Sequence, residues 1–68
     1  MATISDLWAA FEAFQKSTHI EYELRLWADE SGAVDDGFHG TIVRWYSFSE
    51  GIEKLNGLSG LNKATQNG

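Results

Sequence analysis

Hydrophobic and polar residues alternate along a ten-residue segment of the chain, from His19 to Ala28. Such alternation predicts a β-strand with one buried face, because successive side chains of a strand point to opposite sides of the sheet. The core face of this strand would consist of its apolar residues, Ile20, Tyr22, Leu24 and Leu26. The outer face then carries Glu21, Glu23, Arg25 and Trp27.

A second strand is predicted over residues 41–48, which are rich in β-branched and aromatic side chains. Thr41 would lie on the same side of this strand as the core residues Val43 and Trp45, and the outer face would hold Ile42, Arg44, Tyr46 and Phe48. We expect the two strands to form an antiparallel hairpin with Glu23 opposite Arg44. This register brings apolar side chains together inside and opposite charges together outside.

Residues 3–17 have the three- and four-residue spacing of apolar side chains that is typical of an amphipathic helix. Thr3 and Asp6 have the spacing of a capping box, in which a hydroxyl and a carboxylate three residues apart satisfy the first N–H groups of a helix. The residues that line one face of this helix are Ile4, Leu7, Trp8, Phe11 and Phe14.

A second helix is predicted over residues 49–57. Ser47 and Glu50 have the spacing of another capping box, and Ile52 and Leu55 would form the buried stripe. Residues 59–68 are mostly small and polar, so we expect them to form a flexible C-terminal tail.

These elements predict a small α+β domain over residues 1–58, with the order α-β-β-α and two short helices on one face of a hairpin. The connection over residues 29–40 is longer than a usual hairpin loop. It either extends the strands or forms a mobile loop.

The chain has no cysteine, which excludes disulfides and thiolate metal sites. With 68 residues, it buries only about 60% of the surface that its unfolded form exposes. Its nine aromatic residues, three of them Trp, therefore predict stability from aromatic packing, from self-association, or from both. The histidines, His19 and His39, are too few for a zinc site of three or four ligands. We expect no metal and no cofactor.

The net charge of −5 and the scattered basic residues argue against direct binding to nucleic acid or to an anionic membrane surface. A basic protein partner is electrostatically allowed. No apolar segment approaches the ~20 residues of a membrane span, and no signal-peptide pattern is present. We therefore expect a cytoplasmic protein.

No catalytic motif is present: the chain lacks a cysteine nucleophile, a G-x-S-x-G elbow and a glycine-rich phosphate loop. Glu21 and Glu23 share a solvated strand face, which lacks the apolar surroundings that a carboxyl group needs to act as a general acid. We expect that the protein is not an enzyme.

The outer face of the predicted hairpin is the first candidate binding surface. It places three large side chains, Trp27, Ile42 and Tyr46, around four charged residues: Glu21, Glu23, Arg25 and Arg44. Aromatic and arginine side chains are enriched at the centres of protein interfaces. This composition favours a surface for protein binding or dimerisation.

The connection supplies a second candidate, because it carries four carboxylates and no basic residue: Asp29, Glu30, Asp35 and Asp36. Their spacing does not match a calcium-binding loop. We expect them to contact a basic surface on a partner.

The resulting hypothesis is a small acidic protein-interaction module. One form of it is an inhibitor of the kind that phages and mobile elements encode, covering a basic surface of a nucleic-acid-handling or defence protein, an analogy of size and fold alone. The alternative is a structural homodimer, or a small subunit of a larger assembly, that uses the same outer face without inhibition.

Overall fold

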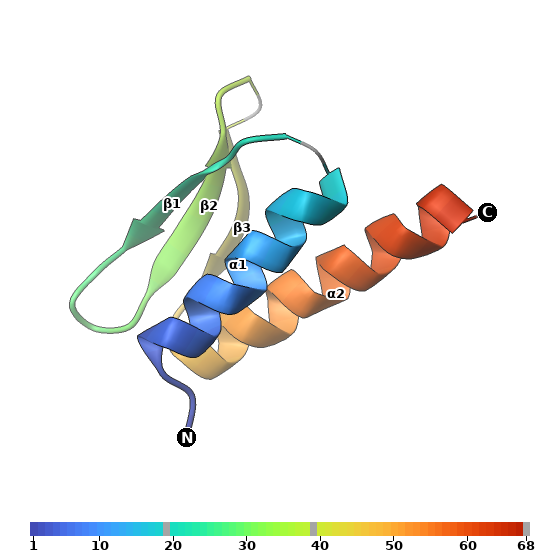
Figure 1. The fold of residues 1–68 in the computed structure, drawn as a ribbon. Helices are drawn as coiled ribbons and strands as arrows, with labels where there is room; N and C mark the ends of the chain where they lie inside the picture. The colour runs from blue at the N-terminus through green and yellow to red at the C-terminus, as the bar shows by residue number, and fades with distance from the viewer. Residues whose placement is uncertain (19, 39, 68) are drawn as a thin grey trace.

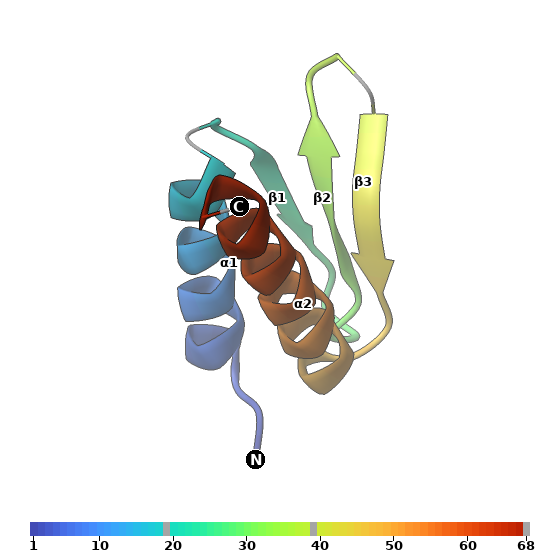
Figure 2. The same ribbon diagram turned by 90° about the vertical axis from the view of Figure 1, so that its right-hand side faces the viewer.

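The computed structural model describes residues 1–18, 20–38 and 40–67, with side chains up to residue 60. Two helices cover one face of a three-stranded antiparallel sheet (Figures 1 and 2). The elements follow in the order α1 (Ile4–Thr18), β1 (Glu23–Leu26), β2 (Gly32–Asp36), β3 (Gly40–Trp45) and α2 (Phe48–Asn67). The predicted α+β class is confirmed, with one strand more than the sequence analysis expected.

The additional strand, β2, lies in the middle of the sheet between β1 and β3 (Figure 2). It comes from the segment predicted to be a connection. The predicted register of Glu23 opposite Arg44 is therefore wrong, because Glu23 pairs with Asp35 on β2. Arg44 pairs instead with Ala33 on the other side of that strand.

Two tight turns allow β2 to form. In the first, the N–H of Trp27 donates to the carbonyl of Ser31, and Glu30 has a φ of 75°. A three-residue hairpin loop needs one residue in this left-handed region, where glycine is most common. Gly40, the first residue of β3, also lies in the left-handed region, with a φ of 77°.

The N-terminus of α1 forms the predicted capping box. The N–H of Thr3 donates to Asp6 Oδ2 at 2.9 Å, and the N–H of Asp6 donates to Thr3 Oγ1 at 3.2 Å. At the start of α2, the N–H of Glu50 donates to Ser47 Oγ as predicted. The carboxylate of Glu50 reaches one residue further back than a standard box and accepts the N–H of Tyr46.

The second helix is longer than predicted, because it passes Gly57 and continues to Asn67, with its C-terminal part lying clear of the strands (Figure 1). Leu55 is fully buried and Ile52 packs against the core, as expected. Ser59, the first residue of the predicted tail, is also buried. The flexibility of residues 59–68 stays a prediction.

The core lies between the two helices and the inner face of the sheet. Its buried members come from α1, β2, β3 and α2: Leu7, Ala10, Phe11, Phe14, Val34, Trp45 and Leu55. Tyr22, Leu24, Leu26 and Val43 pack against this cluster, as predicted. The assignment of Ile20 to the core is wrong, since this residue precedes β1 and is half exposed.

Trp45 is the largest side chain without solvent exposure, and two glycines make room for its indole. A Cβ atom on Gly32 would lie 2.7 Å from Trp45 Cζ2, and one on Gly51 would lie 2.8 Å from Trp45 Cδ2. Gly51 therefore has a packing role that offsets its low helix propensity.

We expect Gly51→Ala to lower the melting temperature, although alanine is favoured over glycine by about 1 kcal/mol inside a helix. The added methyl group would press against Leu7 and Trp45, and such overpacking costs about 1–3 kcal/mol. The matched control is Gly57→Ala in the same helix, where no atom lies within 4 Å of the new Cβ. Thermal unfolding should show Gly57→Ala at or above wild type and Gly51→Ala below it. A gain in both variants would contradict this account of the core.

Candidate protein-interaction surface

The face of the sheet that points away from the helices is hollowed into a groove of about 500 Å³. Because side chains alternate along each strand, every second residue of β1, β2 and β3 reaches this face. We call this hollow the outer groove, and its lining includes Arg25, Trp27, Asp29, Ser31, Ala33, Asp35, Thr41, Arg44 and Tyr46.

Small residues on the middle strand and large residues on the outer strands produce the concave shape. Ser31 and Ala33 form the floor, with Trp27 on one side and Tyr46 on the other. Neighbouring strands lie about 5 Å apart, so the two walls stand on strands separated by about 10 Å. This width can hold one extended chain or one flat side chain.

The two aromatic walls are open to solvent. Trp27 is 55% exposed and Tyr46 is 76% exposed. Ala33, in contrast, is buried although it lies on the outer face, because Arg25 and Arg44 are its neighbours on the two outer strands. The centre of the groove therefore combines an apolar floor, two aromatic rings and two guanidinium groups.

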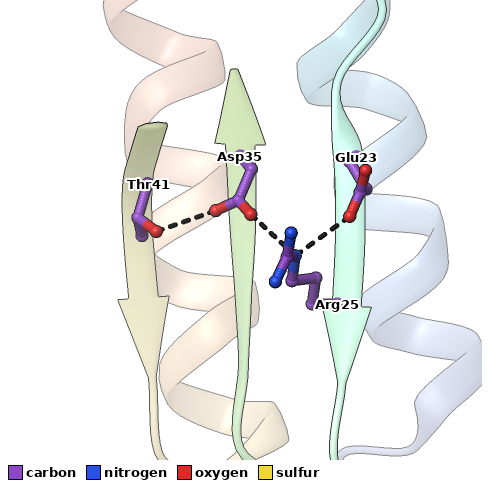
Figure 3. Close-up of polar contacts among 4 residues, drawn as sticks. All are labelled: Glu23, Arg25, Asp35 and Thr41. Carbon is purple, nitrogen blue, oxygen red and sulfur yellow. Dashed lines mark hydrogen bonds and ion pairs between the residues drawn. The ribbon is translucent and has the colours of Figure 1, made fainter. Parts of the chain in front are cut away.

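One end of the groove is fixed by a polar network (Figure 3). Asp35 accepts a hydrogen bond from the hydroxyl of Thr41 at 2.8 Å and forms an ion pair with Arg25 at 2.7 Å. Arg25 also contacts Glu23 at 2.9 Å. With only 17% of its side chain exposed, Asp35 holds all three strands together at this point.

Arg44 differs from Arg25 in that its guanidinium group has no ion-pair partner within the described part of the chain. It lies on β3 next to the exposed ring of Tyr46. An exposed arginine beside aromatic side chains is able to pair with a carboxylate or stack on a ring of a bound partner.

The four carboxylates predicted to form one acidic loop lie at opposite ends of β2. Asp29 and Glu30 belong to the β1–β2 turn, whereas Asp35 and Asp36 end β2. Hydrogen bonds from the hydroxyl and the N–H of Ser31 lower the pKa of Asp29 below its ordinary value. The carboxylate of Glu30 accepts the N–H of Phe48 at 3.4 Å, which connects this turn to the start of α2.

Most of the predicted outer-face residues lie on the expected side of the sheet: Glu23, Arg25, Trp27, Arg44 and Tyr46. Ile42, near an irregularity in the β2–β3 pairing, is partly exposed and does not line the outer groove. Thr41 lines the outer groove in its place, so its assignment to the side of Val43 and Trp45 is wrong. Glu21 precedes β1 and faces a second hollow beside the β2–β3 turn. The floor residues Ser31 and Ala33 were missed, because their segment was interpreted as a connection.

Within residues 1–18, 20–38 and 40–67, no group of three or more His, Asp or Glu side chains is placed to hold a metal ion. His19 and His39 lie outside the described residues. In the same part of the chain, neither helix combines the length and the apolar character needed to cross a membrane.

Comparison of the chain with protein-family models, with curated proteins and with solved structures found no match.

Proposed function

We propose that this chain is a small protein-interaction module that binds another protein through the outer groove. The observation that carries the proposal is the grouping of Trp27, Arg44 and Tyr46 around the apolar floor at Ala33. Tryptophan, tyrosine and arginine are the residue types most enriched among interface hot spots. Trp27, Arg44 and Tyr46 are all exposed, so the three side chains are available to a partner.

The proposed partner presents a basic surface around the contact. The chain carries a net charge of −5, and the exposed Asp29 lies at one end of the outer groove. Carboxylates at the rim increase the rate of association with a basic protein, whereas the central aromatic residues provide most of the affinity. The same charge disfavours nucleic acid as a direct ligand.

The mode of action that we propose is to cover part of the partner's surface, as an inhibitor of a nucleic-acid-handling or defence protein would. A domain of this size has no room for a deep catalytic cleft, and the outer groove is shallow and open. We assign the protein to the cytoplasm on the basis of its composition, which lacks cysteine.

Site-specific photo-cross-linking tests this proposal. Tyr46 would be replaced with p-benzoylphenylalanine and the protein illuminated in an extract of its own cells. The control carries the same group at Phe38, which is 95% exposed but lies in the β2–β3 turn outside the outer groove. We expect a cross-link to one other polypeptide from position 46 and not from position 38. Cross-links only between copies of the chain would favour the homodimer, and the same product from both positions would contradict the proposed site.

A further inference from the structure

The two edges of the sheet differ in how their outward backbone groups are satisfied. Along an antiparallel strand, alternate residues direct their N–H and C=O groups toward one neighbour and then away from it. Directly after β1, the N–H of Trp27 donates to the carbonyl of Ser31 on the β2 side. Arg25, two residues earlier, directs its backbone groups toward the same side. Leu24 and Leu26 therefore direct their backbone groups outward.

The outer edge of β3, which has no neighbouring strand, is covered by an ion pair from α2. Lys54 Nζ donates to the carbonyl of Arg44 at 2.7 Å, and the N–H of Tyr46 donates to Glu50 Oε1 at 3.0 Å. Lys54 and Glu50 also contact each other at 2.9 Å, one turn apart on the helix. The hydrogen bond from Lys54, followed by the one from Tyr46, lowers the pKa of Glu50 below its ordinary value. This pair occupies backbone groups that another strand would need.

The edge of β1 has no equivalent cover. Gln15 of α1 accepts the N–H of Tyr22 at 2.8 Å, just before the strand begins. The outward backbone groups of Leu24 and Leu26 have no side-chain partner among the described residues. An exposed edge of this kind is a template for an additional strand.

Another groove, distinct from the hollow beside the β2–β3 turn, lies between this edge and α1 on the helix side of the sheet. Its volume is about 460 Å³. We call it the edge groove, and it is lined by Trp8, Phe11, Glu12, Gln15, Lys16, Tyr22 and Leu24. The ring of Trp8 is half exposed and contacts Phe11, with 5.7 Å between the ring centroids. A strand added beside β1 would direct every second side chain toward this groove.

We propose that the edge of β1 binds an extended segment of a partner protein by strand addition, with alternating apolar and basic side chains. The apolar side chains would enter the edge groove. The basic side chains would lie on the opposite face of the sheet beside β1, where Glu21 and Glu23 outnumber Arg25. A backbone ladder would supply affinity, and the groove would select the side chains.

A second copy of this chain is a poorer occupant. Two copies would each bring a net charge of −5, and β1 contributes a ladder of only four residues. Stable dimers bury roughly 1,200 Å² or more, which so short a ladder does not supply without further contacts. The proposed segment is therefore part of a different protein and of opposite charge.

This inference goes beyond the proposed function, because it concerns a different surface. The edge groove lies on the helix side of β1, whereas the outer groove lies on the opposite face and is lined by Trp27, Arg44 and Tyr46. Leu24 lines only the edge groove and Tyr46 only the outer groove, so the two sites can be tested separately.

The test uses a synthetic heptapeptide of alternating lysine and valine, with blocked ends, and the isotopically labelled protein. We expect binding to slow hydrogen exchange at the amides of Leu24 and Leu26 and to leave Arg44 on β3 unchanged. A control peptide of the same composition, with its valines and lysines in two blocks, should bind at least about tenfold more weakly. Absence of binding, or protection at Arg44, would overturn the proposal. Chemical-shift changes confined to Trp27 and Tyr46 would also overturn it and would place the peptide in the outer groove.

Backbone substitution provides the second measurement, since a 68-residue chain is accessible by chemical synthesis. N-methylleucine at position 24 removes an outward N–H and keeps the side chain and the ladder to β2. N-methylarginine at position 44 makes the same change on the covered edge of β3. We expect the first change to weaken the heptapeptide at least about tenfold and the second to have little effect. Equal effects would overturn the proposal.

Discussion

Trp45→Ala should abolish cooperative folding at 25 °C. The side chain is fully buried at the point where β2, β3 and α2 meet, and replacing a buried tryptophan with alanine costs about 3–5 kcal/mol. In a domain of fewer than about 70–80 residues, a single hydrophobic core rarely supplies more than about 3–5 kcal/mol of stability. The substitution therefore removes most or all of the free energy of unfolding.

Urea denaturation, followed by far-ultraviolet circular dichroism, measures this effect. Trp27→Ala is the matched control, because it removes the same side chain from a half-exposed position outside the core. We expect the control to retain a cooperative transition, with a change of less than about 1 kcal/mol. A Trp45→Ala protein that unfolds at the wild-type midpoint would show that the core is not organised around this indole.

Trp27→Ala should have its large effect on binding instead, lowering affinity for the partner by at least about 2 kcal/mol, or roughly thirtyfold. Trp27 forms one wall of the outer groove beside Ser31, and its removal would leave that side of a bound partner open to water. Truncating a central aromatic side chain costs this much binding affinity, because the contacts around it exclude solvent only when it is present.

The control for Trp27→Ala is Phe38→Ala, which removes a more exposed aromatic side chain outside the outer groove. Titration calorimetry with the cross-linked partner, once purified, would compare both variants with wild type. We expect Phe38→Ala to bind within about threefold of wild type. Equal losses in the two variants would mean that general surface hydrophobicity, rather than the outer groove, determines the affinity.

The helices could be predicted because their signals are local. Thr3 and Asp6 cap α1 through atoms three residues apart, and the apolar spacing identifies Leu7 and Phe14 as core residues. The end of α2 could not be predicted in the same way. Gly57 resembles a terminating glycine, but the helix continues through it.

The middle strand was missed because its residues have weak strand propensity. The sequence Gly32–Asp36 contains one β-branched residue, Val34, and ends in two aspartates. Its first turn places Glu30 in the left-handed region, where the sequence shows no glycine. The second turn did carry a signal, since Asp36 followed by Gly37 is a common hairpin pair.

The candidate site could be predicted only in part, because the sequence indicates the outer strands but not the strand between them. Alternation within β1 and β3 correctly assigned Trp27, Arg44 and Tyr46 to the outer face, because this property depends on each strand alone. The concave shape depends on what lies between those strands. Ser31 and Ala33 provide the floor only because β2 is inserted there.

The central claim is that the outer groove is free to bind another protein, and the mass of the chain in solution tests it most directly. Light scattering after size exclusion, at low and high salt, should give a monomer of 7.6 kDa in both conditions. Added salt screens the repulsion between acidic chains, so an apolar self-contact would be strengthened or unchanged. A dimer that persists in high salt and dissociates in Trp27→Ala would contradict the claim, because a second copy would then occupy the outer groove.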